Sequence, residues 1–159
     1  MYKIAGEQLP CVFDVSARTV ATQSLNIFGD HSDVYACRQT GFAMLCETNP
    51  QEVMDLSPVA HLATIEGKVP FINFFDGFRT SHEIQKIEKW DYADLKEMCN
   101  MEAVEAFRAH ALNPEHPAMR GSHENGDVFF QHREACNTAY NELPAIVEKY
   151  MAKVNEKLG

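Results

Sequence analysis

The feature that most constrains the fold is an apolar run without alternation, "VPFINFF", at residues 69–75. A strand with one solvent face alternates apolar and polar residues, whereas a strand covered by helices on both faces is apolar throughout. The run therefore predicts a central strand of a parallel sheet, and with it the α/β class. It ends at Asp76 and Gly77, and "FRTSHE" follows. Ligands of open α/β sheets bind beyond the carboxyl ends of the strands, so this boundary also predicts a ligand edge.

Weaker patterns precede this run. Residues 11–17, "CVFDVSA", are β-prone, and the apolar spacing within residues 18–28 predicts a helix. The short apolar pieces "VYAC" and "FAML" predict two extended segments, joined by a turn at "RQTG". The first half of the chain is thus expected to alternate strands and helices.

The clearest helix signal begins at Asn49, which can cap a helix whose first residue is Pro50. Glu52 stands in the position of a capping box, and Gly67 predicts the end of the helix. Ser57 and Pro58 permit a kink near its middle.

The second half of the chain is predicted to be helical. Short helices are expected at "DYADLKEM" and "MEAVEAFRAHAL", followed by a long polar loop over residues 113–127. An amphipathic closing helix is predicted from apolar residues at steps of three and four, namely Leu143, Val147, Tyr150, Val154 and Leu158.

Composition narrows the class of protein. With 159 residues, 45% of them apolar, the chain is long enough for one domain with a core, which we assign to residues 1–159. The 14 Lys and Arg against 23 Asp and Glu give a net charge of −9, which argues against a nucleic acid partner. No apolar stretch has the length of a membrane span, and the N-terminus lacks the apolar core of a signal peptide, so we expect a cytoplasmic protein. The five cysteines include no C-x-x-C pair, which predicts reduced thiols.

Two polar clusters are candidate sites. Asp30, His31 and Asp33 could hold a metal ion or exchange protons, but Asx turns in a polar loop explain the same residues. Thr80, Ser81 and Glu83 fit a helix N-terminus that is capped by a hydroxyl and receives an anion, or one that is capped without any ligand. The string "SHEIQK", which includes Glu83, does not predict a zinc helix, because Lys86 replaces the second histidine that such a helix requires.

Three arginines stand at or just after the ends of apolar segments, namely Arg18, Arg38 and Arg79. A planar guanidinium at the ligand edge of the sheet can bind a carboxylate through two parallel hydrogen bonds. A salt bridge to one of the 23 acidic residues is the alternative for each arginine. The residues alone thus predict an α/β domain that can bind a small anion, and they specify no reaction.

Longer strings carry a family resemblance. "IFGDHSDVYACRQTGFAML", "FFDGFRTSHEIQKIE" and "LNPEHPAMRG" resemble pyruvate:ferredoxin (flavodoxin) oxidoreductase, and the similarity extends almost from end to end. The resemblance implies a later portion of the family's first domain, a pyrimidine-type thiamine diphosphate module with a doubly wound parallel sheet. It also implies that Arg18, in "DVSARTVA", binds the substrate carboxylate. Asp14 stands where family members often carry His.

The resemblance further implies an oxidative decarboxylation of pyruvate to acetyl-CoA and CO2, with electrons passed to ferredoxin or flavodoxin. For the complete enzyme the resemblance implies a homo-oligomer that uses thiamine diphosphate, magnesium and iron–sulfur (4Fe–4S) clusters. The glutamate that activates the aminopyrimidine, the diphosphate and metal site, the cluster motifs and the coenzyme A domain have no counterpart in this sequence. We therefore expect a fragment that is inactive alone and binds no cofactor by itself.

Two alternatives remain at this stage. The same domain remnant could serve as a non-catalytic module that binds a small carboxylate or assembles with another chain. Another 2-oxo acid could also replace pyruvate, since pocket residues outside this sequence help to set specificity.

Overall fold

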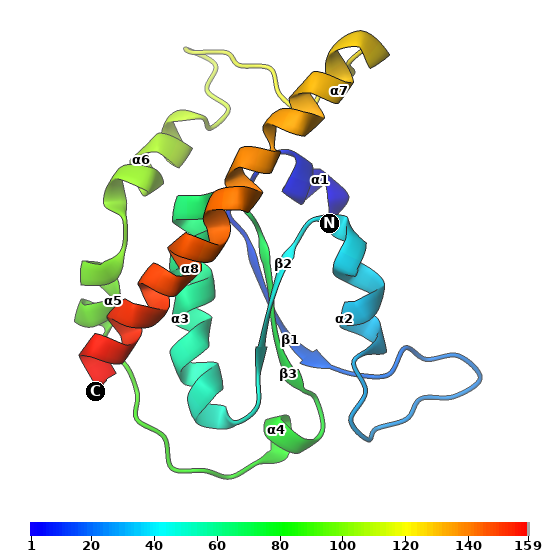
Figure 1. Ribbon diagram of the computed structural model, residues 1–159, viewed down its shortest axis with the longest axis vertical. Helices are drawn as coiled ribbons and strands as arrows, with labels where there is room; N and C mark the ends of the chain where they lie inside the picture. The colour runs from blue at the N-terminus through cyan, green and yellow to red at the C-terminus, as the bar shows by residue number, and fades with distance from the viewer. Residues whose placement is uncertain (159) are drawn as a thin grey trace.

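The computed structural model describes residues 1–158 and has an α/β fold with a parallel sheet of three strands (Figure 1). The strands are β1 (Val12–Ala17), β2 (Ala43–Glu47) and β3 (Phe71–Asp76), in the order β1-β3-β2. Their register places Phe71 of β3 beside Val12 on one side and Ala43 on the other. The apolar run thus forms the central strand, and its first four residues are buried, which confirms the prediction.

One face of the sheet is covered by α3 (Pro50–Gly67). The Asn49 side chain accepts hydrogen bonds from the backbone N–H groups of Gln51 and Glu52, which confirms the predicted start. Glu52 reaches back to the N–H of Thr48, one residue earlier than a standard capping box requires. The helix continues through Pro58 and ends at Gly67, as predicted.

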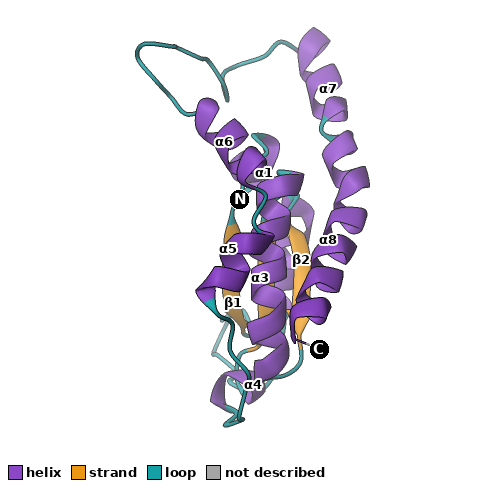
Figure 2. Ribbon diagram, turned by 90° about the vertical axis from the view of Figure 1, so that its left-hand side faces the viewer, coloured by secondary structure: helices purple, strands orange, loops and turns teal. Residues whose placement is uncertain are grey.

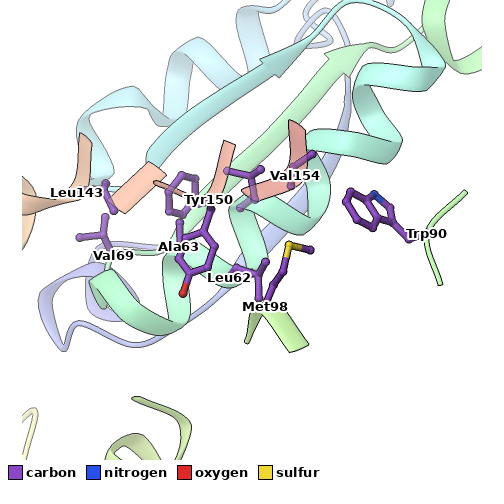
Figure 3. Close-up of a cluster of buried hydrophobic side chains, with 11 residues drawn as sticks. Leu62, Ala63, Val69, Trp90, Met98, Leu143, Tyr150 and Val154 are labelled. Atoms are coloured by element: carbon purple, nitrogen blue, oxygen red, sulfur yellow. The ribbon is translucent and has the colours of Figure 1, made fainter. Parts of the chain in front are cut away.

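The larger core lies between this face and α8 (Asn137–Leu158), the predicted closing helix. Figure 3 shows Tyr150 of α8 beside Leu62 and Ala63 of α3, and Leu143 of α8 beside Val69. The Tyr150 ring is fully buried, and its hydroxyl donates to Glu66 Oε2 at 2.7 Å. The contact between α3 and α8 therefore joins two segments that lie far apart in the sequence (Figure 2).

The other face carries a smaller core, to which α1 (Tyr2–Gly6) and α2 (Ser32–Cys37) contribute. Its buried members are Ala5, Ala17, Val34, Phe42, Ile72 and Phe74. Helices on both faces agree with the doubly wound arrangement that the resemblance implied.

The remaining helices are short. They are the 3-10 turn η1 (Arg38–Thr40), α4 (Arg79–His82), α5 (Tyr92–Met98), α6 (Met101–Ala109) and α7 (Gly126–Ala135). The positions of α5 and α6 confirm the two helices predicted there. Within the described part of the chain, no helix combines the length and apolar character that crossing a membrane would need.

Two local predictions are wrong. Residues 18–28, all described, form a loop, because polar side chains and carbonyls take up the backbone donors, as in the bond from Phe28 N–H to Asn26 Oδ1. The loop's apolar side chains, including Leu25, stay exposed and offer the sheet no helical face. "VYAC" belongs to α2 rather than to an extended segment, and Val34 is the one residue of α2 that is buried. Apolar pieces this short do not distinguish a strand from a helix.

Candidate functional site

The carboxyl ends of the three strands meet at one edge of the sheet. β1 ends at Ala17, β2 at Glu47 and β3 at Asp76, so the residues that follow each strand lie at this carboxyl edge. Because ligands of parallel α/β sheets bind at such an edge, it is the candidate site.

Arg18 follows β1 directly and is half-buried. Its backbone N–H donates to Asp33 Oδ2 at 2.8 Å, and its carbonyl accepts from the Asp33 N–H at 3.4 Å. A Cβ placed on Gly77 would lie 2.3 Å from Arg18 Nε, so the arginine side chain passes directly over that glycine. Among residues 1–158, no carboxylate forms a salt bridge with the Arg18 guanidinium, whose donors thus remain available to a ligand.

Of the other two arginines, one lies at the carboxyl edge of the sheet and the other lies near its amino edge. Arg79 is the first residue of α4 and lies at the carboxyl edge, as predicted. Arg38 lies in η1, which precedes the amino end of β2, so its predicted place at the ligand edge is wrong. Its guanidinium donates to the Tyr35 carbonyl at 2.7 Å. The physical reason is that "VYAC" forms a helix, so no strand ends at this arginine.

Asp30, His31 and Asp33 do not converge on a common point. Asp30 Oδ1 accepts from the Ser32 N–H at 2.6 Å, and hydrogen bonds from Ser32 lower the pKa of Asp30. Asp33 binds the backbone of Arg18, and His31 Nε2 lies 3.9 Å from Asp76 Oδ2. The Asx-turn interpretation is confirmed, and no group of three potential metal ligands occurs within the described chain.

The prediction that Thr80 or Ser81 caps a helix is wrong, because both residues lie inside α4 and Asp76 binds the N–H groups at its start. Asp76 Oδ1 accepts from the N–H groups of Phe78 at 3.0 Å and Arg79 at 2.7 Å. The bond from Arg79 is the main reason that the pKa of Asp76 is lowered. Thr80 instead donates to the Thr48 carbonyl at 3.3 Å, and Ser81 donates to the Gly77 carbonyl.

Sequence reasoning missed a buried polar group under the same edge. Glu47 closes β2 and Asn73 lies in the middle of β3, and both are almost completely buried. Asn73 Nδ2 donates to Asp14 Oδ1 at 2.9 Å. Asp14 also lies 3.8 Å from His61 Nε2 and 3.5 Å from Ser57 Oγ, both on α3. The one available signal was Asn73, a polar residue inside the apolar run.

A cavity of about 680 Å³ lies beside this group, between α3 and the segment that follows α4. Apolar side chains such as Met54, Phe75 and Trp90 form most of its wall, and the Trp90 indole N–H donates to the Met54 carbonyl at 3.1 Å. Polar residues of the wall include Ser57 and His61. The edge thus combines an unpaired guanidinium with an adjacent apolar cavity.

Comparison with known proteins gives one consistent result. The family described as pyruvate flavodoxin/ferredoxin oxidoreductase, thiamine diphosphate-binding, matches residues 1–152. A pyruvate-flavodoxin oxidoreductase of Enterobacter agglomerans is 62% identical over 159 residues, which are 100% of this chain and 14% of that protein. A pyruvate:ferredoxin oxidoreductase of Moorella thermoacetica is 58% identical over 154 residues, which are 97% of this chain and 13% of that protein. A pyruvate dehydrogenase [NADP(+)] of Cryptosporidium parvum is 53% identical over 159 residues, or 8% of its length. The chain thus spans about a seventh or less of these relatives.

Proposed function

The chain belongs to the thiamine diphosphate-binding family of pyruvate flavodoxin/ferredoxin oxidoreductases, and from this premise we propose that it acts as part of a 2-oxo acid oxidoreductase. The reaction we propose is the oxidative decarboxylation of pyruvate to acetyl-CoA and CO2, with electrons passed to flavodoxin or ferredoxin. The similarity to proteins named for this activity, which covers the whole chain, supports the proposal most directly. The cytoplasm is the compartment that we infer, since the five thiols are free.

In this proposal Arg18 binds the carboxylate of the 2-oxo acid. Its position at the carboxyl edge and its lack of a carboxylate partner among the described residues support this role. A guanidinium offers two parallel N–H donors to one carboxylate, which fixes the orientation of the substrate as well as its position. Gly77 leaves room for the guanidinium to lie against the backbone of the edge.

Thiamine diphosphate, when bound, would supply the electron-accepting group that decarboxylation of a 2-oxo acid needs. Iron–sulfur clusters need several cysteine thiolates and do not fit residues 1–158, which contain no group of three His, Cys, Asp or Glu that could hold a metal. Magnesium needs only one or two carboxylates beside phosphate oxygens, so it would accompany the diphosphate of the cofactor. We assign these cofactors, coenzyme A and the electron carrier to other parts of a longer polypeptide. The contribution of this chain is then Arg18 and the edge around it.

We infer that the 159 residues form the later portion of a larger domain. Within the described chain, β1 and β2 pair only with β3, and the exposed side chains of β1 include Phe13. Free strand edges and exposed apolar side chains favour association with further strands or with other copies. Size-exclusion chromatography of the isolated chain is expected to show self-association. A sharp monomer peak with a cooperative thermal transition would contradict this inference.

The isolated chain is expected neither to consume pyruvate nor to reduce a dye in the presence of thiamine diphosphate, magnesium and coenzyme A. Turnover that disappears on replacement of Arg18 would show that the chain is a catalyst by itself. Binding of pyruvate without turnover, lost in the same variant, would favour the alternative of a small-carboxylate-binding module.

The role of Arg18 is tested in the complete polypeptide that carries this segment. Arg18→Ala is expected to raise the KM for pyruvate about a hundredfold, because a charge-assisted contact of a few kcal/mol is lost. Affinity for thiamine diphosphate is expected to stay the same. Arg38→Ala is the matched control, since this arginine lies before the amino end of β2. Unchanged pyruvate kinetics in both Arg18→Ala and Arg18→Lys would refute the assignment.

A further inference from the structure

The most unusual group in the fold is the carboxyl of Glu47. The residue is only 2% exposed, although it ends a strand at the carboxyl edge. Both of its side-chain oxygens are buried, and neither has a hydrogen-bond partner among residues 1–158. Since burial of a carboxylate without donors carries a large free-energy cost, its protonation state needs an explanation.

The groups around Glu47 give it no positive charge. Its register neighbour on β3 is Phe75, and Asn73, two residues earlier on that strand, is 1% exposed and has an unpartnered Oδ1 of its own. The ionisable groups that act on Glu47 are Asp14 on β1 and Glu52 on α3, and both are acidic. His61, also on α3, lies 3.8 Å from Asp14 Oδ2. Arg79 on α4 forms no salt bridge in the described chain.

Glu47 also lies beneath a junction of three elements. The next residue, Thr48, donates from its N–H and its hydroxyl to Glu52 Oε2, at 2.8 and 2.7 Å, and thereby ties the end of β2 to α3. The Thr48 carbonyl accepts from Thr80 Oγ1 of α4 at 3.3 Å. Any movement that exposes Glu47 to water would therefore strain the link between β2, α3 and α4.

We propose that Glu47 is a neutral acid in the folded chain, and that its ionisation opens the junction of β2, α3 and α4 at the edge that carries Arg18. Burial beside acidic groups destabilises a neutral carboxyl only a little. A carboxylate at the same place would lose its hydration and would be repelled by Asp14 and Glu52. The carboxylate is stabilised most readily if Glu47 moves into contact with water. This movement requires that the hydrogen bonds of Thr48 to Glu52 and Thr80 break. The edge thus contains a pH-sensitive device, which does not depend on the catalytic proposal.

The direction of the pH effect follows from the pKa of Glu47. Burial, with a smaller contribution from Asp14, raises this pKa from 4.5 to about 8. A raised acid pKa means that the folded state holds the proton longer than the unfolded state does. The stabilising contribution of the proton is therefore complete below about pH 4.5 and is lost as the pH rises to about 8. Above that value Glu47 is ionised even in the folded chain, and the destabilisation of the closed junction has reached its limit.

Amide hydrogen exchange at a series of pH values tests the proposal on residues 1–159. After correction for the intrinsic rate, protection of segments 43–52 and 76–82 is expected to fall by up to about tenfold per pH unit between pH 5 and 8. Glu47→Gln keeps the neutral shape and should show flat protection over this range. Glu97→Gln on α5 is the matched control, since Glu97 is an acid outside the junction whose pKa is lowered by hydrogen bonding to Lys157, and it should keep the wild-type pH profile. The same profile in wild type and Glu47→Gln would overturn the proposal.

A second measurement covers the case in which Glu47→Gln does not fold. The wild-type chain, labelled with ¹³C at glutamate side-chain carboxyls, is titrated by NMR, and a buried carboxyl is expected to remain protonated at pH 7. Titration of every glutamate below about pH 6 would overturn the proposal without recourse to a variant. Neither readout involves pyruvate, so failure here is distinct from failure of the proposed function.

Discussion

The helices α3 and α8 differ sharply from an outer arm, which we define as residues 101–136 with α6 and α7. α3 and α8 supply most of the larger core, whereas α6 and α7 contain no buried residue. Figure 1 shows α7 and the loop before it extending beyond the end of the sheet. Local sequence features such as N-terminal caps favour helices in both regions: Asn100 caps α6, and Asn49 caps α3. Helix formation is thus set locally, but the contribution of each helix to stability depends on what it buries.

The largest expected difference between the two regions comes from removing an aromatic ring. Tyr150→Ala in α8 should lower the free energy of unfolding by about 3–5 kcal/mol, because it empties a fully buried site. Phe130→Ala in the outer arm should change it by less than about 0.5 kcal/mol, because that ring is 66% exposed. Chemical denaturation of the two variants measures both values. Equal losses would mean that the arm packs against the body in solution.

A smaller difference is expected from helix caps. Asn49→Ala should cost about 1 to 2 kcal/mol, since the Asn49 side chain accepts from two backbone N–H groups. Asn125 occupies the same position before α7, but its side chain makes no capping hydrogen bond. Asn125→Ala is therefore expected to stay within about 0.5 kcal/mol of wild type in the same denaturation experiment. A cost for Asn125→Ala as large as that for Asn49→Ala would break the comparison.

The smallest effect on stability is expected from cutting the arm. Limited trypsin digestion should cleave first after Arg120, which lies in an exposed loop, and mass spectrometry identifies the site. The contacts at this site are exposed ones: Lys3 Nζ donates to the Gly121 carbonyl at 2.6 Å, and Arg120 Nε lies 3.9 Å from Glu7 Oε2. Because exposed contacts contribute little, the cut chain should unfold within about 0.5 kcal/mol of the intact one. Lys153 in α8 is the internal control, and earlier cleavage there would show that α8 opens more readily than the arm.

The parts of the fold that the sequence predicted are those with long or redundant patterns. β3 was visible as an apolar run, α3 from its cap, its first proline and its final glycine, and α8 from five apolar residues in register. The predictions for residues 18–28 and for "VYAC" were wrong because a few apolar residues in a short segment fit more than one structure.

The candidate site was predictable only in part. The chemistry of arginine and the position after a strand placed Arg18 and Arg79 at the correct edge, while the role of Arg18 stays a prediction. The bonds from Phe78 and Arg79 N–H to Asp76 were hidden, because several nearby residues could have accepted them. Glu47 could not be found at all, since a sequence does not show which polar side chain ends up buried without a partner.

Gly77 imposes a constraint that reaches beyond its own position. A Cβ there would lie 2.3 Å from both the Ala17 carbonyl oxygen and Arg18 Nε. The restriction is one of space, because the residue is not among the glycines with positive φ. Even the smallest substitution, Gly77→Ala, must displace the arginine or separate the ends of β1 and β3. If positions 18 and 77 are randomised together, the residues that still allow folding at position 77 should therefore depend on the residue at position 18. The two positions are thus expected to covary.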